Sequence, residues 1–178
     1  MIFHQPHNSK SSYNYNAFFY TTEIWDFHFH KNLELIYVVK GKVKCTINNT
    51  EYILNAGDYG LCLPYDIHSY LPNSDTLYWV GVFSEDYVRL YAKHIQGKSP
   101  LGFTFKCPES TDQLLQSTLI SEHTPSIYIL KACLYAVCDA FLNEINFTDD
   151  AKNKNTNIIL IAEYVCENHT KNITLKDI

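Results

Sequence analysis

Short apolar runs separated by turn residues fill the first half of the chain. Residues 33–39 (LELIYVV) are rich in branched and aromatic side chains, and residues 43–47 (VKCTI) alternate apolar with polar ones. This period of two is typical of a strand with one face in water. Asn48-Asn49 suits a hairpin turn after the second run, because Asn tolerates positive φ. Strands at this density predict a β-sandwich or barrel, with further runs at residues 51–54, 59–63, 68–71 and 77–83.

The second half of the chain has the periodicity of helices. Between residues 127 and 145 apolar side chains recur at spacings of three and four, which is typical of an amphipathic helix. This stripe fits a helix packed on the barrel, and it fits equally a subunit interface in a short antiparallel coiled coil. The candidate dimer-interface residues are Ile127, Leu130, Leu134, Val137, Phe141 and Ile145.

A polar segment near the C-terminus predicts a boundary. Residues 148–157 (TDDAKNKNTN) contain no large apolar side chain and are interpreted as a linker. Beyond it, an amphipathic helix is followed by a second helix start that Thr174 can cap. We therefore expect the start of a further, truncated domain. The predicted organisation is an arm at 1–16, a barrel at 17–108, a helical module at 109–147, the linker at 148–157 and the truncated domain at 158–178.

Charge, cysteine content and hydropathy exclude several classes of function. The 178 residues carry 14 Lys plus Arg against 19 Asp plus Glu, a net charge of −5, and Arg89 is the only arginine. We therefore expect this piece alone not to bind nucleic acid. Six cysteines without a CxxC pair predict reduced, mostly buried thiols. The sequence has neither the pattern of a secretion signal nor the roughly 18 apolar residues of a membrane span, so we expect a cytoplasmic protein.

Two histidines and a glutamate stand close together in the segment His28-Phe29-His30-Lys31-Asn32-Leu33-Glu34. On a strand His28 and His30 point to the same face, and a bend after His30 can bring Glu34 round to it. His68 adds one more imidazole on a later strand. In a barrel interior these four side chains could bind a divalent first-row metal, and they could equally hydrogen-bond a polar small molecule.

Three aromatic residues extend the candidate ligand-binding site. Tyr70 has the parity of His68 and is expected to face inward with it. Tyr37 and Trp79 are candidates because aromatic faces stack on sugar-like or apolar ligands, with core packing as their alternative role. The sequence does not decide which face of residues 77–83 points inward.

The motifs around these residues resemble the two motifs of the cupin superfamily. His28, His30, Glu34 and Gly41 match the first motif with the family spacing, and Gly57-Asp58 with Pro64 to His68 resembles the second. Thr22 and Asp66 stand where the family usually has Gly, and His68 comes one residue early. The resemblance implies a mainly β fold, a cupin-like double-stranded β-helix (jelly-roll barrel), followed by C-terminal helices.

The order of the segments resembles AraC-type transcriptional regulators. A cupin-like barrel is followed by a helical pair and a polar linker, as in that family. Residues 158–178 then resemble the start of the family's helix-turn-helix DNA-binding domain. The resemblance implies a bacterial, non-enzymatic regulator in which the barrel binds a small-molecule effector and an antiparallel helical module forms a homodimer. DNA would be bound only through the absent C-terminal domain, and the arm at residues 1–16 is a candidate lid.

A second hypothesis comes from a different class of protein. A metal-dependent cupin enzyme, such as an oxygenase or isomerase, would use His28, His30, Glu34 and His68 as metal ligands. The linker and the truncated domain count against it, since a small cupin enzyme needs neither. The sensor hypothesis requires no cofactor, and a divalent metal is its lesser alternative.

Overall fold

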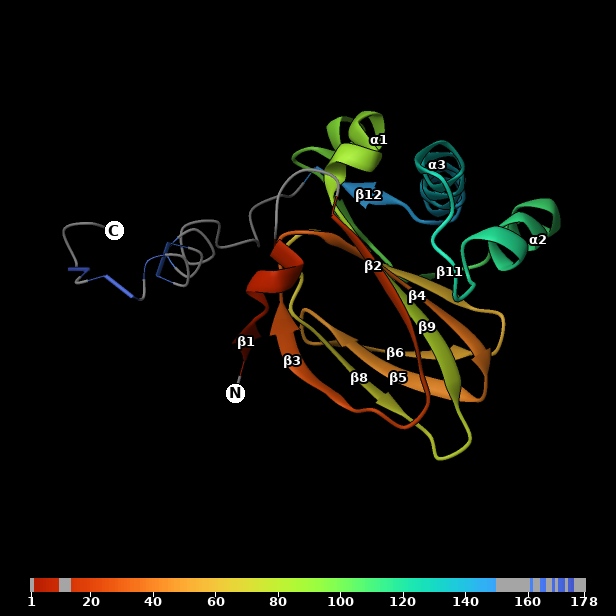
Figure 1. Cartoon of the computed structure of the whole chain (residues 1–178), viewed down its shortest axis with the longest axis horizontal. Helices are drawn as coiled ribbons and strands as arrows, with labels where there is room; N and C mark the ends of the chain where they lie inside the picture. Colours follow the sequence, from red (N-terminus) through yellow and green to blue (C-terminus); the bar gives the residue numbers. More distant parts are fainter. Residues whose placement is uncertain are drawn as a thin grey trace.

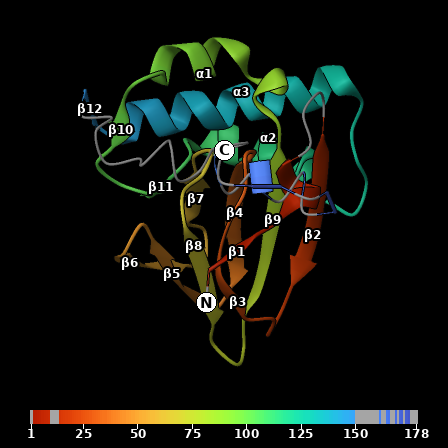
Figure 2. The same cartoon turned by 90° about the vertical axis from the view of Figure 1, so that its left-hand side faces the viewer.

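Two five-stranded β-sheets face each other, and helices cover the outer face of one of them (Figures 1 and 2). The computed structural model describes residues 2–9 and 14–149, together with residues 161, 164, 165, 168, 170, 171, 173 and 174. The larger strands are β2 (Tyr15–Tyr20), β3 (Trp25–Phe29), β4 (Leu33–Lys40), β5 (Lys42–Ile47), β6 (Thr50–Asn55), β7 (Tyr59–Cys62), β8 (His68–Pro72) and β9 (Leu77–Phe83). Two-residue strands are β1 (Phe3–His4), β10 (Ser99–Pro100), β11 (Thr104–Phe105) and β12 (Phe147–Thr148). The helices are α1 (Arg89–Ile95), α2 (Glu109–Thr118) and α3 (Ile127–Glu144), with 3-10 turns η1 (Pro6–Ser9) and η2 (Glu85–Tyr87).

The chain crosses repeatedly between the two sheets. One sheet has the order β1-β3-β8-β5-β6 and the other the order β11-β7-β4-β9-β2, while β10 and β12 pair outside both. Between β5 and β6 the hairpin predicted at Asn48-Asn49 is present, and both residues have positive φ, 46° and 70°. This architecture confirms the predicted cupin-like barrel followed by helices.

The sheet that contains β4 is buried on both faces. Ile36 and Val38 pack between the two sheets, whereas Leu35 and Tyr37 pack on the opposite face with the helices. Because successive side chains of a strand point to opposite faces, β4 contributes to two separate cores. One core fills part of the barrel, and the other joins the barrel to α1, α2 and α3.

The apolar stripe of α3 belongs mostly to the second core. Leu130, Leu134, Val137 and Phe141 are each at most 3% exposed within this single chain. Their prediction as dimer-interface residues is therefore wrong, because the sheet of the same chain already covers them. Ile145 is half-buried against the same core, and only Ile127, 44% exposed, remains at the surface.

The predicted domain limits coincide only partly with the observed elements. Within the arm, β1 pairs in parallel with β3, so its first residues add a strand to the barrel. Thr148 pairs with Ser99 and extends the folded part past the predicted end of the helical module. Most of the predicted linker and truncated domain lies outside the described residues. Within the described part of the chain, no helix is long and apolar enough to cross a membrane.

We expect Leu134→Ala to lower the free energy of unfolding by about 2–5 kcal/mol, because it leaves a cavity in a close-packed core. Urea denaturation followed by circular dichroism measures the loss. Ile129→Ala is the matched control on the same helix, since Ile129 is 44% exposed and its loss should cost no more than about 0.5 kcal/mol. Equal losses in the two variants would contradict this assignment of the α3 stripe.

Candidate functional site

Four buried ionisable side chains meet inside the barrel. His28 lies on β3, His30 directly after it, Glu34 on β4 and His68 at the start of β8. One donor atom from each lies within 4.8 Å of the others, and all four residues are buried. Antiparallel pairing of β3 with β8 places His28 opposite His68, with ring centroids 4.1 Å apart. The predicted convergence of these four residues is therefore present.

Each imidazole is oriented by a backbone carbonyl. Nδ1 of His28 lies 2.7 Å from the carbonyl oxygen of Asp26, and Nδ1 of His68 lies 2.7 Å from that of Asp66. Nδ1 of His30 lies 3.0 Å from the carbonyl oxygen of Asn32. A carbonyl oxygen only accepts, so each Nδ1 carries the donated proton, and in a neutral ring Nε2 is then an unprotonated acceptor.

The Glu34 carboxylate faces two of these rings. Its Oε2 lies 3.0 Å from Nε2 of His30, and its Oε1 lies 3.5 Å from Nε2 of His68. Oε1 of Glu34 and Nε2 of His68 are buried and have no hydrogen-bond partner among the described residues. Acceptor nitrogens of His30 and His68 therefore face acceptor oxygens of Glu34. These atoms are satisfied only when a ring gains a proton or a cation lies among them.

The pKa shifts follow from burial and from these close contacts. Burial, with the charge of His68 adding to it, lowers the pKa of His28 to about 4. Burial alone would raise the pKa of Glu34, but the charge of His68 and the close contact with His30 outweigh it and hold this pKa well below its usual range. Burial opposes the charged form of His68, yet the neighbouring Glu34 carboxylate raises its pKa overall. Positive charge is thus favoured on His68, beside the Glu34 carboxylate, and disfavoured on His28.

The four residues fit a divalent first-row metal. Imidazole nitrogens and one carboxylate oxygen are ligands that such ions take in proteins. Ligating histidines generally donate their other ring N–H to a carbonyl or carboxylate, and all three rings here do so. The unpartnered buried Oε1 of Glu34 and Nε2 of His68 are the atoms that an ion would satisfy.

The loop before β8 explains how His68 reaches the cluster despite its altered motif. Tyr65 adopts a positive φ of 66°, in a region where glycine is the usual residue. The Asp66 carboxylate accepts hydrogen bonds from the backbone N–H of Leu63 at 2.7 Å and from the side-chain amide of Asn48 at 2.8 Å. Its backbone carbonyl accepts from His68. Asp66 therefore holds the loop in the shape that aims His68 inward.

A cavity of about 350 Å³ opens onto this cluster. His28, Glu34 and Tyr70 line it, and the barrel contributes Val80 and Val82 from β9. The remaining lining residues come from the arm, β2 and β3, namely Gln5, His7, Asn8, Asn14, Asn16, Phe18, Tyr20 and Trp25. Five of them belong to the arm that was predicted as a candidate lid, whereas Phe18, Tyr20 and Trp25 were missed by sequence reasoning. The alternation of Asn14, Asn16 and Phe18 with Tyr15 and Ala17 was the available signal.

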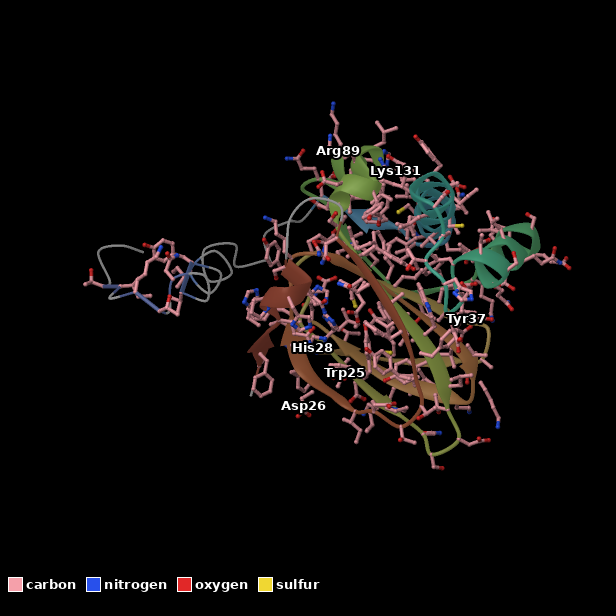
Figure 3. The ribbon with its side chains drawn as sticks, in the orientation of Figure 1. Trp25, Asp26, His28, Tyr37, Arg89 and Lys131 are labelled. Atoms are coloured by element: carbon pink, nitrogen blue, oxygen red, sulfur yellow. The ribbon has the colours of Figure 1, made fainter. Side chains whose placement is uncertain are left out.

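Tyr37 and Trp79 are not among the cavity-lining residues, contrary to their candidate role. Tyr37 stacks on Tyr59 at a centroid distance of 4.5 Å and points toward the helices, away from His28 (Figure 3). Trp79 lies on the same face of the sheet, and its ring covers Gly81, where a Cβ would be only 2.3 Å away. Both residues have the strand parity opposite to that of the cavity, so they serve the core beneath the helices. Tyr70 does line the cavity, as expected, and its ring centroid lies 5.6 Å from that of His68.

Comparison with known families decides what kind of domain this barrel is. Residues 18–126 match the model of the AraC-like ligand binding domain. The chain belongs to this family. AraC-type membership, predicted from the sequence motifs, is thereby confirmed. A search of curated proteins gave no match.

Solved structures share the fold of this AraC-like domain. ToxT from Vibrio cholerae, at 1.65 Å, superposes with a TM-score of 0.57 and 14% sequence identity, over 94% of this chain and 69% of that one. ToxT with a bound unsaturated fatty acid has a TM-score of 0.57 and 16% sequence identity, over 95% of this chain and 68% of that one. ToxT bound to (E)-4-(8-methylnaphthalen-1-yl)but-3-enoic acid has a TM-score of 0.57 and 16% sequence identity, over 94% of this chain and 70% of that one. At such identities the likeness concerns the fold alone.

Asp66→Ala is expected to destabilise the chain by about 1–3 kcal/mol, because the buried N–H of Leu63 loses its acceptor. Thermal and urea denaturation measure this loss. Asp75→Ala is the control, since the Asp75 carboxylate is 82% exposed and its ion pair with Lys40 should contribute less than about 1 kcal/mol. If Asp66→Ala were as stable as Asp75→Ala, the loop would not depend on this carboxylate.

Proposed function

We propose that this chain is the effector-sensing and dimerisation part of a bacterial, cytoplasmic transcriptional regulator. Its barrel binds a small molecule, and binding controls how a C-terminal helix-turn-helix domain contacts DNA. The observation that carries the proposal is the cavity of about 350 Å³ with His28 and Glu34 in its wall. Ligand pockets are commonly cavities of roughly 300–1,000 Å³ with a few convergent polar groups, which agrees with this one.

The N-terminal arm is suited to report on an occupied cavity. Gln5, His7 and Asn8 contribute to the cavity wall. The arm is tied to the barrel by the hydrogen bond from Gln5 N–H to the Phe29 carbonyl and by Ser9 Oγ, which accepts from Lys31 N–H. A ligand that touches both arm and barrel favours the docked arm over a released one, which is a population shift.

The cavity offers two kinds of surface to a ligand. Phe18, Val80 and Val82 supply apolar contact, while amide side chains supply hydrogen-bond donors and acceptors. ToxT, which shares this fold, has been solved with an unsaturated fatty acid bound and with a butenoic acid derivative bound, and both ligands combine an acid group with an apolar part. An effector of mixed polarity is accordingly proposed here.

The homodimer is part of the same proposal, but it needs a surface other than the buried stripe of α3. On the first turn of α3, Ile127, Tyr128 and Ile129 are 44%, 82% and 44% exposed. The proposed contact with a second copy is therefore assigned to these exposed apolar and aromatic side chains. DNA contact remains assigned to a domain beyond these residues.

A metal-dependent cupin enzyme is the second candidate, and the donor set of His28, His30, Glu34 and His68 is the observation that favours it. A bound divalent ion would act as a Lewis acid toward a substrate oxygen. The chain's own residues would hold the ion, orient a substrate against Phe18 and Val82, and exclude water. Turnover of a substrate by purified protein would support the enzyme, and saturable binding without turnover would support the sensor.

Filling the cavity is expected to abolish effector binding. Val82 is 6% exposed and lines the cavity, so Val82→Phe places a larger ring in the ligand's space. Calorimetric titration with a panel of sugars, acids and other small metabolites should give one saturable ligand for the wild type and at least about tenfold weaker binding for the variant.

Val39→Phe is the matched control for that experiment. Val39 follows Val38 on β4, is 38% exposed and does not line the cavity. This variant should bind the same compound as tightly as the wild type. Unchanged binding by Val82→Phe would place the ligand outside the barrel and would contradict the proposed function.

A further inference from the structure

The cavity wall is poor in charge. Glu34 is the only Asp or Glu in it, and no Lys or Arg lines it among the residues that the structure describes. His7 and His28 are its only other ionisable nitrogen bases. An anionic ligand would therefore find no permanently cationic side chain in the cavity. A ligand's charge must be matched by the cluster itself.

The net charge of the cluster changes sign when the cluster holds a divalent ion. Three neutral imidazoles and the Glu34 carboxylate provide one negative charge, so a divalent ion leaves one positive charge in excess. Asp66, whose backbone carbonyl orients His68, has its carboxylate engaged by Leu63 N–H and the Asn48 amide and does not line the cavity. Excess charge in a buried place is costly unless a counter-charge accompanies it.

The cavity is the open side of this centre. His28 and Glu34 belong both to the cluster and to the cavity wall, whereas His30 and His68 belong to the cluster alone. A ligand in the cavity therefore meets the cluster at the edge formed by His28 and Glu34. The apolar side chains of Phe18, Val80 and Val82 line the same cavity and can receive a short hydrocarbon part.

We propose that the effector is a small carboxylic acid, bound as its anion, whose carboxylate neutralises a divalent ion held by His28, His30, Glu34 and His68. This inference rests on the proposed function and names the ligand class of the same cavity. It assigns to an ion the role that a Lys or Arg would have in a metal-free receptor for acids. A cavity of about 350 Å³ lies near the lower end of the usual range for ligand pockets, which limits the acid to a small one.

The first experiment measures the ion alone. The chain is purified without a polyhistidine tag, stripped with a chelator and titrated with Co²⁺, whose visible absorption reports its ligands. One equivalent should bind, and His28→Ala should weaken binding at least about tenfold. His28 makes its hydrogen bond to the Asp26 carbonyl through Nδ1 and takes part in neither ion pair of Glu34, so the variant is expected to fold.

Two further variants control this measurement. His94→Ala removes an exposed imidazole and should leave Co²⁺ affinity unchanged. His28→Asn keeps a polar side chain and serves where the alanine variant is unstable. Absence of stoichiometric Co²⁺ binding by the wild type, or equal affinity in His28→Ala and His94→Ala, would overturn the inference.

The second experiment measures the acid. The Co²⁺-loaded chain is titrated with formate, acetate and 2-hydroxyisovalerate, and with the uncharged amide of the last compound. The carboxylates should alter the Co²⁺ absorption, with 2-hydroxyisovalerate binding most tightly and the amide at least about tenfold more weakly. The metal-free chain should bind none of them measurably.

The outcomes separate this inference from the proposed function. Formate and acetate are small enough to enter any open position, so an unchanged spectrum with all three carboxylates would overturn the acid class. Equal binding of acid and amide would overturn it too. A neutral metabolite that saturates the metal-free chain, and that Val82→Phe no longer binds, would refute this inference while supporting the proposed function. Failure of every compound in the panel to bind would count against both.

Discussion

The structure depends on one sheet being buried on both faces. Strands β4 and β9 contribute side chains alternately to the barrel interior and to the core beneath the helices. A shift of one residue in their register would exchange the two sets and place Glu34 among the aliphatic residues that face α3. The helical layer therefore fixes which side chains face the barrel interior, and with them the chemistry of the cavity.

The three imidazoles of the polar cluster are oriented by hydrogen bonds to main-chain carbonyls. Asp26, Asn32 and Asp66 each present a carbonyl oxygen to one imidazole, so ring orientation is set by backbone geometry and not by neighbouring side chains. Two of these bonds, those of His30 and His68, leave Nε2 of the ring directed at Glu34. An arrangement of four mutually facing acceptors is poor as a structural core and good as a receptor for positive charge.

Sequence reasoning was most successful where local geometry decides the outcome. The spacing of His28, His30 and Glu34 fixes their common face, and the structure brings them together. It failed for Tyr37 and Trp79, because strands with apolar residues on both faces carry no signal of which face is inward. The stripe of α3 was ambiguous for a related reason, since core and interface both demand apolar side chains at helical spacing. The arm's share in the cavity depends on long-range pairing with β3, which no local pattern encodes.

The pairing of β1 with β3 sets Phe3 directly beside His28 in the sheet. The ladder consists of two consecutive pairs, Phe3 with His28 and His4 with Phe29, and the hydrogen bond from Gln5 N–H to the Phe29 carbonyl continues it. So short a ladder has little cooperativity, and a modest change in free energy is enough to form or break its hydrogen bonds. Because β1 pairs with the strand that carries His28, a shift of that strand would move Phe3 and His4 with it.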